Sequence, residues 1–354
     1  MDLGADEFEE SLPLLQELVQ EADFVGLDIE FTGLRSNLSG PQQISLFDLP
    51  SEWYLKTRQS VQQFTICQIG LSVFSAIEGE ANKYIAHSCN FFLFPTTFGI
   101  LDSEFSFQAS SVQFLNQYGF NYNKFLKNGI PYMNEEQEKK IRHDILTGNW
   151  RVRSSPDKDQ IKAVIDKVTR WLDLAKEGDW MTLPGIAESY DQFKQNIHSL
   201  FPVLIDTKNV TKDIWKEMNF PRVSNLSEVY EVLNSDLNPT KNSGPEIVHA
   251  SRCEKYVKTK CPHEAAYDAF LCGSVLLKVA HLLLQKIHGG CYKYKRSVTH
   301  GWEAYFLNKK CASLPLSCGL AVYGPLVSMC VLDREGAGSS GAPQCPGSHI
   351  FYFF

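Results

Sequence analysis

The stretch that most constrains the fold is residues 24–34, where two carboxylates interrupt an otherwise apolar run. It reads Phe-Val-Gly-Leu-Asp-Ile-Glu-Phe-Thr-Gly-Leu. The apolar beginning favours a buried β-strand, and the Phe-Thr-Gly that follows the acids favours a turn. Because residues i and i+2 of an extended strand point to one face, the side chains of Asp28 and Glu30 should project together.

Two like charges on one face of a buried strand are costly unless something neutralises them. In a strand they would lie roughly 5–7 Å apart. A divalent cation held by hard carboxylate oxygens is the usual remedy. The alternative is an exposed strand in which the D-x-E pattern arose by chance. The apolar residues before Asp28 favour the metal site.

Composition indicates a folded protein with a sizeable core. The chain has 354 residues, of which 44% are apolar and 12% aromatic. Its 34 basic and 41 acidic residues give a net charge of −7, which argues against a protein that coats nucleic acid nonspecifically. A nuclease stays compatible with this charge, because metal-binding carboxylates can lie beside a local basic groove.

Cysteine usage and the opening residues predict a compartment. The ten cysteines are scattered without a C-x-x-C pair, so we expect reduced, buried thiols at Cys67, Cys89 and Cys272. The first seven residues are acidic where a secretory or mitochondrial signal would be basic. An intracellular, reducing location is therefore expected.

Apolar periodicity predicts an α/β fold, a mixed sheet followed by helices, over residues 1–287. Besides the acid-bearing strand, strands are expected at residues 64–74, 84–95 and 203–207. Helices are expected at residues 6–22, 111–119, 134–144, 157–176, 225–233 and 264–287. Residues 238–251 are expected to form a loop.

The character of the chain changes at residue 288. Residues 288–354 are rich in Gly, Ser and Cys and show no sustained periodicity. Residues 313–332 are uncharged over 20 positions, which is long enough to span a bilayer, but they include two Pro, two Gly and three Ser. We expect an irregular tail and no membrane attachment.

A second informative segment surrounds the start of the last helix. Pro262 suits a helix entrance, so His263 stands at the start and Asp268 lies five residues on. That offset places the two about 140° apart around a helix, so they need not hold one ion together. His263 could act as a general base while Asp268 holds a metal. The bland alternative is a solvent-facing His before a Glu264 that favours the helix dipole.

Together, an early D-x-E on a strand and a late H-x-x-x-x-D on a helix resemble a DEDD-type 3′–5′ exonuclease. Further stretches resemble the poly(A)-specific ribonuclease family. The most distinctive are Asn-Gly-Ile-Pro-Tyr at 128–132 and Phe-Pro-Val-Leu-Ile-Asp-Thr-Lys at 201–208. The others are residues 22–33, 64–74, 90–96, 108–119 and 263–271.

The resemblance implies a ribonuclease H-like mixed sheet flanked by helices, and a metal-dependent enzyme that trims RNA 3′ ends by hydrolysis. The RNA would be poly(A) or a small-RNA precursor such as a piRNA precursor. Asp28, Glu30 and Asp268 match the family's metal-holding acids, for two expected Mg²⁺ ions, and His263 matches the general base.

The same resemblance implies partners and a location. Phe31 and Leu34 fall where the family packs the terminal nucleotide. Single-stranded RNA 3′ ends are the expected partners, together with a second copy of the chain, because family members often dimerise. The cytoplasm is the expected location, while association with the nucleus or an organelle membrane occurs in the family.

One departure from the family bears on activity. The family carries a third acid in a G-H-N-x-x-x-D segment before the strand at 203–207, and this sequence has no such segment. A block near 186–188, with much of an inserted nucleic-acid-binding domain, is therefore expected to be missing. The resulting fold would be incomplete relative to the family.

The missing acid leaves alternatives open. Candidate substitutes are Asp173, Asp179, Asp191 and Asp206, of which Asp206 is the most plausible by position. Without a substitute, the chain would be a catalytically impaired RNA-binding or partner-binding variant. A chain that fails to fold stably is a third interpretation.

Overall fold

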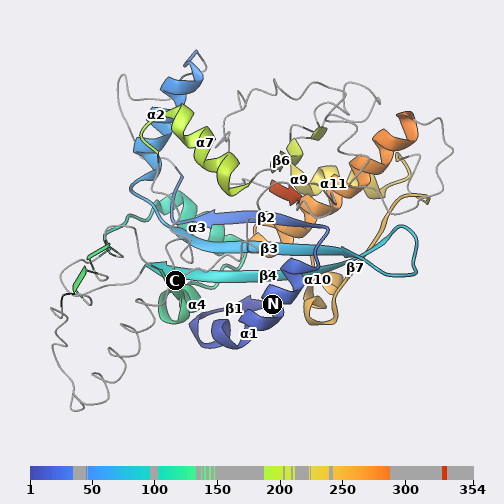
Figure 1. Cartoon of the computed structure of the whole chain (residues 1–354), viewed down its shortest axis with the longest axis horizontal. Helices are drawn as coiled ribbons and strands as arrows, with labels where there is room; N and C mark the ends of the chain where they lie inside the picture. Colours follow the sequence, from blue (N-terminus) through green and yellow to red (C-terminus); the bar gives the residue numbers. More distant parts are fainter. Residues whose placement is uncertain are drawn as a thin grey trace, which may run out of the picture.

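Long antiparallel strands form the centre of the sheet in this computed structural model (Figure 1). β2 (Phe24–Phe31) pairs with β3 (Ile66–Ala76), and β3 pairs with β4 (Lys83–Pro95). The structure describes residues 1–34, 45, 47–95, 103–132, 137, 139–140, 143–144, 147, 187–201, 204–208, 210–211, 223, 225–238, 242–287 and 329–332.

Short strands extend this sheet on both sides. They are β1 (Asp2–Leu3), β5 (Ile130–Tyr132), β6 (Leu204–Asp206), β7 (Glu246–His249) and β8 (Met329–Leu332). The order is β1-β4-β3-β2-β8-β6, and β5 and β7 also pair with β4. β1, β5 and β7 run parallel to β4, so the sheet is mixed, as predicted.

Helices cover the sheet, and those predicted within the described residues are confirmed to within about two residues. The helices observed are α1 (Ala5–Gln20), α2 (Pro50–Val61), α3 (Ala109–Gln117), α4 (Tyr122–Asn128), α7 (Tyr190–Leu200), α9 (Leu226–Asn234), α10 (Lys255–Lys258) and α11 (Ala265–Ile287). Of these, α1, α3, α9 and α11 are the predicted ones. The helix predicted at 157–176 and most of that at 134–144 lie outside the described residues. The predicted class, a mixed α/β sheet flanked by helices, is confirmed.

α11 is the core helix, and it packs against β2, β3 and β4. Its residues 265–283 are long and apolar enough to cross a membrane, judged by length and composition alone. That window is 94% buried inside the protein, which is also typical of a core helix. Cys67, Cys89 and Cys272 are buried free thiols, as expected.

Glycines let α11 lie directly on the sheet. A Cβ at Gly70 would come within 1.9 Å of the carbonyl carbon of Ala265, and one at Gly26 within 2.3 Å of the carbonyl oxygen of Ala269. No side chain fits at such distances, so these two positions on β3 and β2 require glycine. The first two turns of α11 are thereby placed above the middle of the central strands.

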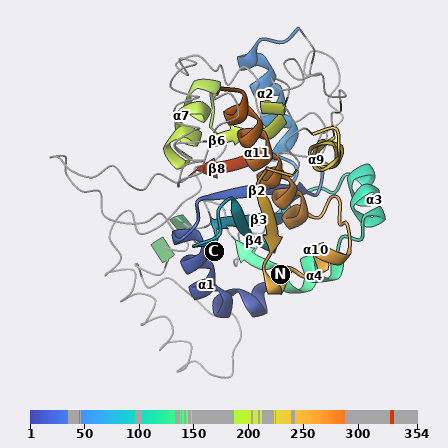
Figure 2. The same cartoon turned by 90° about the vertical axis from the view of Figure 1, so that its right-hand side faces the viewer.

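Two segments differ from the prediction. Residues 246–249 were expected in a loop but form β7, because the edge of β4 offers unpaired backbone groups to a Glu-Ile-Val-His segment. Residues 329–332, expected in an irregular tail, form β8 between β2 and β6 (Figure 2). Neither pairing has a local signal, because both partners are remote in sequence.

Candidate active site

The two acids of β2 face the start of α11. Asp28 is 0% exposed and Glu30 3%, and burial alternates along the strand, so the prediction of one shared face is confirmed. Asp28 is the cross-strand partner of Gly70, whose missing side chain makes room for Ala265. Since cross-strand partners share a face, Asp28 lies under the first turn of α11.

His263 reaches the same place through its backbone conformation. Its φ is +62°, in the left-handed region, and its backbone N–H donates to Oδ2 of Asp268 at 3.0 Å. Nδ1 of His263 lies 3.9 Å from the same oxygen. The helical-wheel separation of these two residues was the wrong guide, because His263 precedes the helix and turns back over its first turn.

Side chains from the sheet anchor the first turn of α11. The N–H of Ala265 donates to Oε1 of Gln68 at 3.0 Å, and the N–H of Ala266 donates to Oδ1 of Asn90 at 2.7 Å. A helix begins with unsatisfied N–H groups, so these two bonds from β3 and β4 serve as caps. Asp268 follows within one turn, and its position is therefore tied to the sheet.

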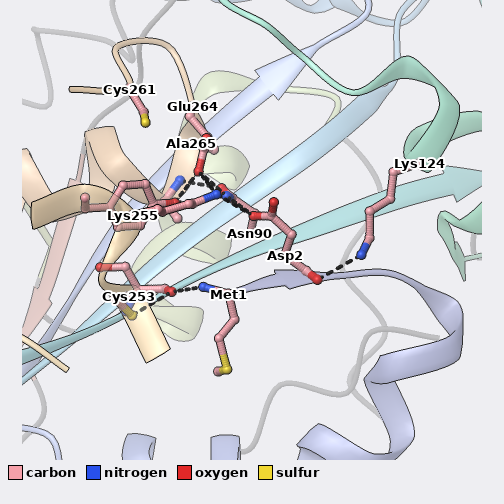
Figure 3. A network of polar contacts seen from close by, with 12 residues as sticks. Met1, Asp2, Asn90, Lys124, Cys253, Lys255, Cys261, Glu264 and Ala265 are labelled. Carbon is pink, nitrogen blue, oxygen red and sulfur yellow. Dashed lines mark hydrogen bonds and ion pairs between the residues drawn. The ribbon is translucent and has the colours of Figure 1, made fainter. Parts of the chain in front are cut away.

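A polar cluster around Glu264 completes this anchor (Figure 3). Asn90 donates to Oε1 of Glu264 at 2.6 Å, and Nζ of Lys255 lies 2.6 Å from that oxygen. Lys255 also pairs with Asp2 at 2.9 Å, which ties in β1. Glu264 therefore binds charged and polar partners. The side chain of His263 is only 14% exposed, so the alternative of a solvent-facing histidine does not hold.

Phe114 of α3 and Tyr118, the residue that follows this helix, pack against the imidazole of His263. Its ring centroid lies 4.6 Å from that of Phe114 and 4.2 Å from that of Tyr118, both edge-on. Such contacts favour a defined orientation of the ring. The sequence predicted the helix at 111–119, but nothing in it linked these aromatics to a residue nearly 150 positions away.

Burial and neighbouring acidic groups raise the pKa values of two acids of the site. Burial, reinforced by the charge of Asp268, raises the pKa of Glu30 well above its ordinary value. Burial also raises the pKa of Asp268 to about 7, against the lowering effect of its hydrogen bond from His263. Burial lowers the pKa of His263. Without a cation, the site therefore favours protonated acids and a neutral imidazole.

The residues present fit a divalent cation. Ligand atoms of Glu30, His263 and Asp268 all lie within 4.8 Å of one another. Among the described residues, neither Oε1 of Glu30 nor Nδ1 of His263 has a hydrogen-bond partner, although both atoms are buried. Buried polar atoms are normally satisfied, so Oε1 of Glu30 is suited to a bound ion, and the lone pair of Nδ1 of His263 is free to take an ion or a proton. Asp28 lies two residues before Glu30 on the same face.

The two residues predicted to bind the terminal nucleotide lie near the end of β2. Phe31 and Leu34 are half-buried, and the N–H of Leu34 donates to Oε1 of Gln108 at 3.0 Å, just before α3. Their contact with a terminal nucleotide stays a prediction.

The two candidate substitutes for the third acid that the structure describes, Asp206 and Asp191, lie apart from the cluster. Asp206 aligns with Met329, which aligns with Leu27, so two strand spacings, roughly 10 Å, separate β6 from β2. Asp191 lies on α7, 80% exposed, and pairs with Lys194 at 2.7 Å. Asp173 and Asp179 lie outside the described residues.

Comparison with known proteins identifies the relatives of this chain. CAF1 family ribonuclease matches residues 4–182 and 171–276. Poly(A)-specific ribonuclease PNLDC1 of Mus musculus is 66% identical over 386 residues, which cover 82% of this chain and 73% of the relative. The chain belongs to the CAF1 ribonuclease family. Members of this family are 3′–5′ exoribonucleases, which are hydrolases, and they generally depend on divalent metal ions.

Other relatives agree with this membership. PNLDC1 of Homo sapiens is 70% identical over 364 residues, covering 75% of this chain and 70% of the relative. Poly(A)-specific ribonuclease PARN of Xenopus laevis is 38% identical over 144 residues, covering 40% of this chain and 23% of the relative. The resemblance to the poly(A)-specific ribonuclease family is therefore confirmed.

Solved structures match only weakly. Pop2p of S. pombe, in a form with Mg²⁺ and Mn²⁺ bound, is 15% identical, covers 82% of this chain and 94% of that chain, and has a TM-score of 0.34. The RNase domain of the yeast Pop2 protein is 14% identical, covers 82% and 87%, and has a TM-score of 0.37.

Proposed function

We propose that this chain is a metal-dependent 3′–5′ exoribonuclease that trims RNA 3′ ends by hydrolysis, with poly(A) as substrate. The observation that carries the proposal is the convergence of Glu30, His263 and Asp268 within 4.8 Å, beside Asp28. The names of the PNLDC1 and PARN relatives support poly(A). Small-RNA precursors, such as piRNA precursors, are the second substrate to be tried.

Asp28, Glu30 and Asp268 would hold the ion, with Mg²⁺ as the expected species. A bound divalent cation supplies positive charge and Lewis acidity for phosphodiester hydrolysis. Its presence would also reverse the protonation of Glu30 and Asp268, which burial otherwise favours.

His263 would accept a proton at Nδ1. The pKa of this imidazole is lowered by burial, so the ring is neutral at physiological pH and ready to act as a base. The hydrogen bond from the backbone N–H of His263 to Asp268 positions the residue, and packing against Phe114 and Tyr118 positions its ring.

A second function is favoured by a specific observation. The alignment with the mouse relative spans 386 positions, but 82% of this 354-residue chain is only about 290 residues, so about 96 positions of the relative have no counterpart here. This supports a deletion within the chain, and a deletion at the predicted place near 186–188 would remove the third acid. The chain would then bind RNA through an impaired site.

One assay separates the two functions. A 5′-labelled oligo(A) is incubated with Mg²⁺ and the full chain, Glu30→Gln, or the matched surface variant Glu9→Gln. Progressive shortening by the full chain and Glu9→Gln, reduced at least about 100-fold in Glu30→Gln, supports the enzyme. Equal, negligible shortening by all three overturns it. Fluorescence anisotropy of the same RNA without divalent metal then measures binding alone.

Homodimerisation, a cytoplasmic location and the domain boundary near residue 287 stay predictions. Sedimentation velocity of the full chain tests the first of them.

A further inference from the structure

β8 lies between β2 and β6 and pairs with both strands. Met329 aligns with Leu27 of β2 and with Asp206 of β6, Cys330 with Gly26 and Ile205, and Val331 with Val25 and Leu204. β8 is antiparallel to both strands, and Figure 2 shows it (red) lying between them. One four-residue segment therefore joins two edges of the sheet.

β6 depends on this segment for its place in the sheet. Within the described residues β6 pairs with β8 and with no other strand. Without β8, β2 and β6 would face each other across roughly 10 Å, which is two strand spacings and too far for backbone hydrogen bonds. Both edges would then present unpaired N–H and C=O groups in the interior, which is costly.

The segment that fills the gap comes from a remote part of the chain. α11 ends at Ile287 and β8 begins at Met329, so residues 288–328 connect them. Met-Cys-Val-Leu is apolar, uncharged and free of proline, a composition that suits a strand with neighbours on both sides. Because closure entropy grows slowly with loop length, a long connection can still deliver such a strand.

We propose that the gap between β2 and β6 is a strand-binding site, and that residues 329–332 are its built-in occupant. The site takes an extended apolar peptide antiparallel to β2. Its occupation pairs Val25, Gly26 and Leu27, which directly precede Asp28, and so holds the acidic strand in one sheet with β6. Residues 329–332 are thus a structural part of the domain that carries the candidate active site.

Hydrogen–deuterium exchange of the wild-type full chain tests the assignment without any substitution. Amides of residues 329–332 and 204–206 should exchange at least about tenfold more slowly than in an unstructured peptide. Paired amides of β3 and β4 serve as the internal reference. Exchange of residues 329–332 at the unstructured rate overturns the proposal. So does protection that disappears on dilution, because the strand would then come from a second copy.

Val331→Pro then tests whether the occupant can be replaced. Proline removes a backbone donor and cannot continue a central strand, whereas Val331→Ile keeps both and is the matched control. In Val331→Pro, amides of β2 and β6 should exchange about tenfold faster, while those between β3 and β4 stay protected. A peptide with the sequence of residues 327–334, added in trans, should restore protection of β6. Failure of the peptide to do so in a folded variant overturns the strand-binding site.

Discussion

His263 and Asp268 meet through the backbone of His263. Its N–H donates to Oδ2 of Asp268 at 3.0 Å, and its imidazole Nδ1 stands 3.9 Å from that same oxygen. The left-handed φ of +62° turns the chain at His263 back toward Asp268. If His263 had helical φ and ψ angles, it would lie on a different side of the helix from Asp268. One carboxylate thus orients the histidine while remaining available to a cation with Glu30.

Asp268→Asn should stabilise the protein without metal at neutral to alkaline pH. The folded pKa of about 7 exceeds the unfolded value of about 3.9, so this group's contribution is complete below pH 3.9 and is lost as pH rises through 7. At pH 8 without divalent ions, Asp268→Asn should be more stable than wild type by on the order of 2 kcal/mol. Urea denaturation measures this difference.

A metal titration completes that experiment. Mn²⁺ should raise the unfolding midpoint of the wild type and leave that of Asp268→Asn unchanged, because binding to the native state alone stabilises it. The exposed variant Asp191→Asn should respond as the wild type does. A larger Mn²⁺ effect on Asp268→Asn than on wild type would contradict the assigned ligand.

Phe114→Ala should raise the pKa of His263 toward its ordinary value of about 6.5, because removal of the phenyl ring lets water reach an imidazole whose pKa is lowered by burial. NMR titration of the imidazole resonances measures the pKa directly. Tyr118→Phe keeps its ring over the imidazole and should leave the pKa unchanged. An unaltered pKa in Phe114→Ala would show that the ring does not shield His263.

Gly70→Ala should cost about 3 kcal/mol of unfolding free energy, because the added methyl would meet the backbone of Ala265 at 1.9 Å. The start of α11 must then lift off the sheet, so Mn²⁺ binding should weaken as well. Gly79→Asn is the control: Gly79 has open space around it and a φ of +80° that Asn tolerates. Similar losses in both variants, by urea denaturation, would argue against the close packing.

Tyr54→Phe should loosen the segment that begins at Ala187. The buried hydroxyl of Tyr54 donates to the carbonyl of Ala187 at 2.6 Å and so joins α2 to a residue three positions before the start of α7. Its loss leaves a buried acceptor and should cost about 1–2 kcal/mol. Faster amide exchange in residues 190–200, with Tyr118→Phe unchanged, is the expected readout. Equal exchange in wild type and Tyr54→Phe would show that α7 is held by other contacts.

The candidate site was predictable in its parts. Asp28 and Glu30 share a face because a strand has a period of two, and this follows from their spacing alone. The helix that carries Asp268 follows from a long apolar run after Pro262. Each inference uses residues within one element, where backbone geometry converts spacing into direction.

The assembly of those parts was decided by the tertiary structure. The sequence by itself determined the acidic strand, the core helix and the family. Only the folded chain decided that His263 turns back onto Asp268, that Phe114 and Tyr118 enclose it, and that residues 329–332 fill the sheet. The physical reason is that strand pairing and side-chain packing join groups remote in sequence, and these contacts depend on register and backbone conformation that no local spacing encodes.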